Sequence, residues 1–164
     1  MAKISIYLAG PLFGIADRHH NLLLAQELEK LGYTVILPQK EALKFFNGER
    51  FDLKGISKDC KRQSMENDVV VANIDGPDAD SGTALEVGIA LSRASIANKP
   101  KVICIRTDFR TNREQEIGIN GMFEFADRVI YMPAFTSSLK EITEFYKGLA
   151  KKIDNAIKEL AVRK

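Results

Sequence analysis

Short apolar runs alternate with longer amphipathic stretches along this chain, and the alternation predicts the order of its secondary structure. Apolar runs bounded by glycine, proline or charged residues are typical of strands, and they occur at residues 3–9, 33–38, 69–75, 100–107 and 128–132. Helical periodicity occurs at residues 19–32, 55–68 and 82–99 and over about the last 28 residues. Residues 39–54 carry mixed signals and fit either a long loop or an irregular helix.

The strand at residues 69–75 is apolar on both faces, as expected inside a parallel sheet. Strands of this kind alternating with helices predict one doubly wound α/β domain over residues 1–164. Its sheet is expected to be mainly parallel and five-stranded, flanked by helices, and flavodoxin-like or Rossmann-like. Ligands bind beyond the carboxyl ends of such strands. We therefore expect the site in residues 7–13, 38–40, 75–86 and 107–112 and in the segment before Met132.

Composition narrows the class of protein. Hydrophobic residues make up 45% of the chain and charged residues 28%, which is typical of a soluble globular domain, and no apolar run is long enough to span a bilayer. Residues 1–13 lack the pattern of a signal peptide, so we expect a cytoplasmic protein. With 24 basic and 22 acidic residues there is no electrostatic reason to expect nucleic-acid binding. The basic stretch at residues 147–164 has the spacing of an amphipathic helix with a solvated face.

Cofactor and metal signatures are missing from the sequence. Its two cysteines, Cys60 and Cys104, and its two histidines, His19 and His20, do not form a usual zinc-ligand set. The glycine-rich motifs of dinucleotide-binding and P-loop proteins do not occur either. We therefore expect neither a metal nor a cofactor, and we interpret the histidines as solvated residues at a helix start.

The stretch "DSGTALEVG" at residues 80–88 places two carboxylates around a predicted helix start. Asp80 is a good N-cap residue, since its side chain can accept hydrogen bonds from the first turn. Capping does not require Glu86, which lies further into the helix among small and apolar neighbours. Glu86 is therefore either exposed on one edge of the helix or partly buried at a functional site.

A carboxylate in a cofactor-free pocket suits one kind of chemistry in particular. It can cleave a glycosidic bond through a covalent sugar–carboxylate intermediate. Ser81 and Thr83 have no histidine and aspartate partners that would indicate a serine nucleophile. Gly10, in "AGPLFG" at the end of the first predicted strand, suits either a close backbone approach to a ligand or only a turn.

The chain resembles the nucleoside 2-deoxyribosyltransferases. The resemblance rests on "IYLAGPLF" near the start, "NDVVVANIDGPDADSGTALEVGIAL" in the middle and "INGMFEFADRVIYM" late in the chain. These blocks follow the same order of strands and helices through the whole domain. The middle block is the most specific of the three.

The resemblance implies roles for individual residues. Glu86 matches the nucleophile that attacks the anomeric carbon, and Tyr7 matches a tyrosine that orients it. Asp80 matches an acid that binds the hydroxyls of the sugar. Asn120 and Met122 match residues that family members contribute to the site of a neighbouring subunit, where Asn120 would contact the 5′-hydroxyl. A homo-oligomer, at least a dimer, is therefore expected.

The chain departs from the family pattern at one position. Where the family has an aspartate that protonates or holds the departing base, ungapped matching places Cys60, with Asp59 one residue earlier. A step of one residue turns a helical side chain by about 100°. Asp59 is our candidate for the base-side acid, with a structural surface acid as the alternative. Gln39, at the end of the second strand, is a candidate contact to the base.

The implied activity is transfer of a 2-deoxyribosyl group between nucleobases, with 2′-deoxynucleosides and free nucleobases as substrates and net retention at the anomeric carbon. A related group of similar fold hydrolyses 2′-deoxynucleoside 5′-monophosphates. A third alternative is a non-catalytic nucleoside-binding protein. Tyr7 together with Glu86 argues against this last alternative, because a binding protein has no need of an ionised nucleophile.

The transferase and the hydrolase are expected to differ in the residues that would lie next to the 5′-phosphate of the substrate. Asp80 and Asn120 stand where a phosphate would lie, and a carboxylate would repel a phosphate dianion. The hydrolase remains an alternative because Ser81, Arg106 and Arg110 offer the hydroxyl and cationic groups that could bind a phosphate. The alternative for the two arginines is salt bridges within the loop, to the acids at positions 108 and 114.

Overall fold

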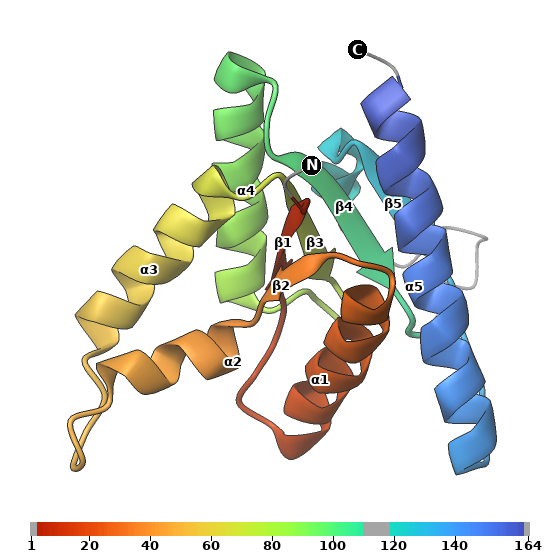
Figure 1. The fold of residues 1–164 in the computed structure, drawn as a ribbon, viewed down its shortest axis with the longest axis horizontal. Helices are drawn as coiled ribbons and strands as arrows, with labels where there is room; N and C mark the ends of the chain where they lie inside the picture. Colours follow the sequence, from red (N-terminus) through yellow and green to blue (C-terminus); the bar gives the residue numbers. More distant parts are fainter. Residues whose placement is uncertain (1–2, 110–118, 163–164) are drawn as a thin grey trace.

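A five-stranded parallel sheet forms the centre of the molecule (Figure 1). The structure, a computed structural model, describes residues 3–109 and 119–162. Its strands are β1 (Ser5–Ala9), β2 (Thr34–Ile36), β3 (Val69–Asn73), β4 (Lys101–Arg106) and β5 (Arg128–Tyr131). They lie in the order β2-β1-β3-β4-β5, and each neighbouring pair is parallel. The predicted flavodoxin-like α/β fold is confirmed.

Helices cover both faces of this sheet (Figure 1). They are α1 (Ile15–Lys30), α2 (Pro38–Glu41), the 3-10 helix η1 (Ala42–Phe45), α3 (Leu53–Glu66), α4 (Ser81–Ala97), the 3-10 helix η2 (Gly121–Phe125) and α5 (Leu139–Val162). Helices α1 and α5 pack together on one face, and α4 covers the other face with α3 beside it. Within the described part of the chain, no helix has the length and apolar character needed to cross a membrane.

Alternation along the strands divides the core between the two faces. Ile6 and Leu8 of β1 belong to the cluster under α1 and α5. Tyr7 and Ala9 belong to the cluster under α4. The period of two therefore turns the Tyr7 ring toward the α4 face, which is where the candidate site lies.

Two helices begin earlier than the pattern predicts. Helix α1 starts at Ile15 instead of residue 19, because Gly14 precedes it and the Gly14 N–H donates to Asp17 at 3.0 Å. Helix α3 starts at Leu53 instead of residue 55, because the Asp52 carboxylate caps it by accepting from the Gly55 N–H at 3.0 Å. Polar caps, which carry no hydrophobic periodicity, extend both helices.

The segment at residues 39–54 resolves into short helices. It contains most of α2, all of η1 and the first residues of α3, joined by a turn in which Phe46 and Phe51 form an isolated antiparallel bridge. The irregular-helix alternative is therefore the better of the two expectations. This segment lies beyond the carboxyl end of β2.

Candidate active site

Tyr7 and Glu86 form the centre of the candidate site. Tyr7 is fully buried, and its hydroxyl donates a hydrogen bond of 2.7 Å to Oε1 of Glu86. The contact exists because α4 packs on the β1–β3–β4 face through Val87 and Ala90, which places Glu86 beside the strand. The structure thus joins the two residues for which the sequence predicts a nucleophile and its orienting group.

Burial controls the charge of Glu86. The side chain is half-buried, and loss of hydration raises its pKa from 4.5 to about 7, with the negative charge of Asp80 adding to the rise. Hydrogen bonds from Tyr7 and Cys60 act in the opposite direction and lower the pKa. Burial, and then the Glu86 charge, raises the pKa of Tyr7 far above its usual range, so the phenol stays protonated and acts as a donor. A carboxyl group of this kind is ionised in a large fraction of molecules at neutral pH.

Cys60 is the third group at this point. It comes from α3, and it lies near enough to the Tyr7 hydroxyl and the Glu86 carboxyl group to affect the pKa of both. Burial is the main cause that raises the pKa of Cys60, so the group is a neutral thiol near pH 7. The sequence favours Asp59 as the base-side acid, and the structure places Asp59 in an ion pair with Arg62, 2.5 Å away on the same helix. Cys60 is therefore the α3 side chain beside the tyrosine and the glutamate.

Asp80 is the N-cap of α4, as the sequence predicts. Its Oδ1 accepts from the Thr83 N–H at 3.0 Å and from the Thr83 hydroxyl at 3.3 Å. The carboxylate is half-buried and lies near enough to Glu86 to affect its charge. Asp80 therefore has a structural role at the helix start and an electrostatic role at the site.

Two clamps that the sequence reading misses fix the loops after β3 and β4. The Asp75 carboxylate accepts from the Thr107 N–H at 2.6 Å, the Thr107 hydroxyl at 2.5 Å and the Asp108 N–H at 2.8 Å. In return, the Asp108 carboxylate accepts from the Gly76 N–H at 3.2 Å. In the sequence, Asp75 is recognisable only as an acid at the end of a buried strand. Its position there does not predict which residues it bonds to.

Arg106 forms part of the same connection. Its side chain is 2% exposed, and Nη1 donates to the carbonyl oxygens of Ile74 at 2.8 Å and Gly76 at 3.0 Å. Its Nη2 lies 4.0 Å from Oδ2 of Asp108, which corresponds to the expected loop salt bridge. Arg110 and Glu114, the other partners considered from the sequence, lie outside the described residues.

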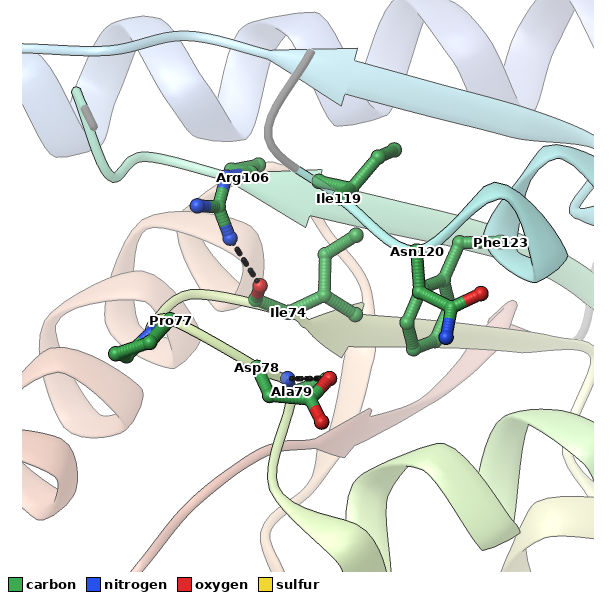
Figure 2. A pocket seen from close by; sticks show the side chains of 8 residues that line it. All are labelled: Ile74, Pro77, Asp78, Ala79, Arg106, Ile119, Asn120 and Phe123. Carbon is green, nitrogen blue, oxygen red and sulfur yellow. Dashed lines mark hydrogen bonds between the residues drawn. The ribbon is translucent and has the colours of Figure 1, made fainter. Parts of the chain in front are cut away.

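A small pocket lies between these loops and the segment before β5 (Figure 2). Its lining residues are Ile74, Pro77, Asp78, Ala79, Arg106, Ile119, Asn120 and Phe123. Asn120 caps η2, because its Oδ1 accepts from the Met122 N–H at 3.0 Å, and both Asn120 and Met122 are exposed. Glu86 and Tyr7 do not line this pocket. Asn120 therefore contributes to this pocket, whereas Tyr7 and Glu86 form their hydrogen bond in the core under α4.

Gly10 and Gln39 lie near the ends of β1 and β2. A side chain at Gly10 would place its Cβ 3.3 Å from Cβ of Asn73 and 3.4 Å from Oδ1 of Asn21, so close packing accounts for the glycine. The Gln39 amide donates to the Arg18 carbonyl oxygen at 3.1 Å and accepts from Nδ2 of Asn21 at 3.2 Å. Asn21, which the sequence reading does not single out, thus contacts both regions.

No metal site is evident in the residues that the structure describes. Among them, no group of three or more His, Cys, Asp or Glu side chains could hold a metal ion.

The fold and the site together define a flavodoxin-like α/β protein with a half-buried, hydrogen-bonded glutamate over its central strands. The family model for nucleoside 2-deoxyribosyltransferase matches residues 6–122. The chain belongs to this family. The matched region includes Tyr7, Cys60, Asp80, Glu86 and Asn120.

Solved structures show the same fold at low sequence identity. A conserved protein from Enterococcus faecalis V583 is 26% identical, with a TM-score of 0.64 and coverage of 90% of this chain and 99% of that chain. A 2-deoxyribosyltransferase from Bacillus psychrosaccharolyticus is 22% identical, with a TM-score of 0.59 and coverage of 85% and 90%. A CMP N-glycosidase from Clostridium botulinum is 18% identical, with a TM-score of 0.51 and coverage of 92% and 98%. No curated protein matches the sequence.

Proposed function

We propose that this protein transfers a 2-deoxyribosyl group from one nucleobase to another and that Glu86 is its nucleophile. The observation that carries the proposal is the 2.7 Å hydrogen bond from the buried Tyr7 hydroxyl to Glu86. A buried tyrosine that donates to one carboxylate oxygen fixes the orientation of the group. A pKa of about 7 leaves Glu86 ionised in much of the population at neutral pH, and an ionised carboxylate is the form that can attack.

The proposed reaction has two displacements at C1′ of the sugar. A Glu86 oxygen attacks C1′, the bond from C1′ to the base nitrogen breaks, and the electron pair leaves with the base. The base takes a proton from water, or from Asp59 after that acid has left its ion pair with Arg62 and been protonated. A ring nitrogen of the second base then attacks C1′ from the face that the first base left, and its N–H proton passes to the conjugate base of the group that protonated the first base. The glutamate departs as a carboxylate, and two inversions give net retention.

The remaining candidate residues bind the substrate in this proposal. Asp80, at the start of α4, binds sugar hydroxyls with the part of its carboxylate that the cap does not use. The Gly10 backbone and the Gln39 region border the base. Asn120 and Met122 are supplied by a neighbouring subunit in this proposal, which agrees with the exposure of both side chains in one chain. The proposed assembly is a homo-oligomer of at least two chains.

Hydrolysis of 2′-deoxynucleoside 5′-monophosphates is the competing activity. The charges near the site disfavour it, because Asp80 and Asp78 are carboxylates and the Arg106 guanidinium is bonded to two carbonyl oxygens. Because Nη1 is used by these carbonyl oxygens, a phosphate at Arg106 would have to be bound by Nε or Nη2 of a side chain that is 2% exposed. Unphosphorylated nucleosides therefore fit the described residues better.

A base-exchange assay tests the proposal. The purified chain is incubated with deoxyinosine and free adenine, and the products are separated by chromatography. New deoxyadenosine supports a transferase, whereas free deoxyribose without exchange, or base release from a deoxynucleoside monophosphate, identifies a hydrolase. The intermediate is sought by mass spectrometry, as one deoxyribosyl group added to the peptide that contains Glu86.

Glu86→Gln is the matched control, because it keeps the size of the side chain and removes the charge. We expect it to abolish exchange and labelling while the chain remains folded. If wild type shows neither exchange nor hydrolysis, and Glu86→Gln binds nucleoside as wild type does, the chain is a binding protein and the proposed activity is wrong.

A further inference from the structure

Asn21 of α1 is a buried polar residue at the edge of the sheet where the candidate site lies. It is 2% exposed, and its Nδ2 donates to the Pro11 carbonyl oxygen at 2.9 Å and to Oε1 of Gln39 at 3.2 Å. Pro11 belongs to the loop after β1, and Gln39 belongs to α2, which follows β2. Because β1 and β2 are neighbouring parallel strands, Asn21 joins the two segments that leave their carboxyl ends.

Arg18, three residues earlier on the same face of α1, holds the rest of this loop. Its Nη1 donates to the carbonyl oxygens of Leu12 at 3.2 Å and Phe13 at 3.0 Å. Together with the bond from Asn21, three consecutive carbonyl groups of the loop therefore accept from side chains of α1. The carbonyl oxygen of Arg18 in turn accepts from Nε2 of Gln39 at 3.1 Å. The loop after β1 and the start of α2 are thus fixed to one helix.

The chemistry of these partners determines which way each amide points. A carbonyl oxygen can only accept, so the nitrogen of Gln39 faces Arg18 and its oxygen faces Asn21. Asn21 meets two acceptors, the Pro11 carbonyl and Oε1 of Gln39, and both bonds leave from its nitrogen. Gln39 is half-buried, and its two bonds leave one N–H and one acceptor position of the amide for a ligand.

We propose that Asn21 is a positioning residue, which fixes the Gln39 amide relative to the loop after β1 so that its oxygen and nitrogen face a nucleobase in one set order. This inference rests on the proposed function, in which these two segments border the base. Proteins recognise a base by the donors and acceptors at its edge. An amide that turned over would exchange donor for acceptor and lose this recognition.

The effect is measurable on Gln39 itself, without any turnover. The side-chain amide signals of Gln39 are assigned in ¹H–¹⁵N spectra of the full-length protein, and the exchange of its amide protons with water is measured. In Asn21→Ala, the Gln39 oxygen loses its donor. We expect the signals to move and the exchange to quicken by about 2- to 10-fold. Asn21→Leu keeps about the same volume but has no N–H, so it should have the same effect.

Asn67→Ala is the matched control, because it removes the same arrangement from another part of the chain. Asn67 is 6% exposed, and its Nδ2 donates to the carbonyl oxygen and to Oε1 of Gln63, each at 2.9 Å. It lies just before β3, at the edge of the sheet opposite the candidate site. Asn67→Ala should lower stability in urea unfolding, as Asn21→Ala does, and leave the Gln39 signals unchanged.

The base-exchange assay tests whether Asn21 acts through Gln39. Asn21→Ala should raise KM for the accepting base by about 2- to 10-fold and leave kcat within about twofold, because Tyr7 and Glu86 keep their contact. Loss of folded protein would instead lower the apparent kcat. In the Gln39→Ala background, Asn21→Ala should raise KM no further, because the group through which it acts is already gone. An equal rise in both backgrounds would overturn the inference.

Gln39 signals and exchange that are the same in wild type, Asn21→Ala and Asn21→Leu would also overturn it. So would changes of equal size in Asn67→Ala, since they would indicate a general loosening of the fold. If neither Asn21 variant folds, Gln39→Ala tests the same contact, and unmoved side-chain amide signals of Asn21 would contradict it. A wild-type chain without exchange or hydrolysis refutes the proposed function, whereas the Gln39 signals still decide whether Asn21 orients that amide.

Discussion

The hydroxyl of Tyr7 lies 2.7 Å from Oε1 of Glu86, although the two residues are 79 positions apart in the chain. The sheet makes this contact, because β1 and β3 are neighbours and α4 follows β3 back across the same face. Tyr7 is held by the core of that face and has no freedom to turn away. The group that orients Glu86 is therefore carried by a rigid strand of the sheet and not by a flexible loop.

Removal of this hydroxyl should change the pH dependence of the reaction. In Tyr7→Phe, Glu86 loses a donor that lowers its pKa, so the pKa should rise above about 7. A hydrogen bond to a charged group contributes about 1.5–3 kcal/mol, which corresponds to a shift of roughly one to two pH units. Rates measured from about pH 5 to pH 9 should show the acidic limb displaced upward by that amount.

Tyr33→Phe provides the control for this experiment. Tyr33 is also a buried tyrosine that donates to a carboxylate, Asp154, at 2.7 Å, but it lies under α1 and α5 on the opposite face. Its substitution should lower stability and leave the pH profile in place. An equal displacement in both variants would show that the Tyr7 hydroxyl has no specific effect on Glu86.

Glu86 should make the protein less stable as the pH rises. Its pKa is about 7 in the folded state and 4.5 in the unfolded chain, so between these values the folded state binds more protons. Stability conferred by the protonated form is therefore lost as the pH increases from 4.5 to 7. The shift corresponds to roughly 3 kcal/mol in total.

Glu86→Gln should remove this dependence, because glutamine resembles the protonated form. Urea unfolding of wild type and variant at about pH 5 and pH 8 measures it. The advantage of the variant should be roughly 2–3 kcal/mol larger at the higher pH. A difference between variant and wild type that is the same at both values would mean that burial does not perturb Glu86.

Asp80 should reveal its two roles when it is replaced by two different residues. Asp80→Asn keeps an oxygen that can cap α4 but removes the charge that raises the pKa of Glu86, so the acidic limb should move to lower pH with little loss of stability. Asp80→Ala removes both, and the missing cap should cost about 1 kcal/mol. If Asp80 also binds the sugar, KM for the nucleoside rises in both variants. An acidic limb that stays in place in both would exclude the electrostatic role.

Asp75 should contribute to stability through its clamp on the loop after β4. Asp75→Asn offers one acceptor oxygen where the carboxylate serves the Thr107 N–H, the Thr107 hydroxyl and the Asp108 N–H. The donors left without a partner should cost about 1–3 kcal/mol in urea unfolding. Asp78→Asn is the matched control, since Asp78 is exposed and accepts from the adjacent Ala79 N–H at 3.0 Å. Equal losses in the two variants would argue against the clamp.

The sequence predicts the strands and the order of layers because burial leaves a periodic pattern. The run at residues 69–75 is apolar on both faces, and β3 is buried at each of its positions. The start of α4 can also be predicted from the sequence, because Asp80 is a typical N-cap residue. The apolar pattern predicts late starts for the two helices that begin after Gly14 and Asp52, because these caps stand outside the pattern.

Contacts between distant side chains were harder to predict. The sequence leaves Asp59 and Cys60 as neighbours on one helix, and only the packing of α3 on α4 decides which of them reaches Glu86. The partners of Asp75 come from another loop, so its spacing to Thr107 and Asp108 contains no periodic signal. The position of Gln39 after a strand predicts a contact to the base, but it does not show that the Gln39 amide is bonded to Asn21 and Arg18.

Asn120 should reveal whether the site is shared between chains. Glu86→Gln removes the nucleophile, whereas Asn120→Asp keeps the oxygen that caps η2 and changes the group offered to the substrate. Each variant alone should have little exchange activity. If Asn120 serves the neighbouring subunit, a mixed dimer of the two variants contains one site with both native residues. Mixing equal amounts under subunit exchange should then restore about a quarter of the wild-type activity.

The activity of the mixture distinguishes a site shared between two subunits from a site completed within one chain. In one chain, Asn120 lines a pocket with Asp78 and Arg106, and Glu86 is not part of it. A site completed within the chain would gain nothing from mixing, because every Glu86→Gln chain lacks the nucleophile and every Asn120→Asp chain lacks the amide. Native mass spectrometry of the mixture, with one variant labelled with ¹⁵N, measures the extent of subunit exchange. An absence of recovery despite full exchange would contradict the shared site. Recovery near a quarter would place Asn120 opposite Glu86 across a subunit interface.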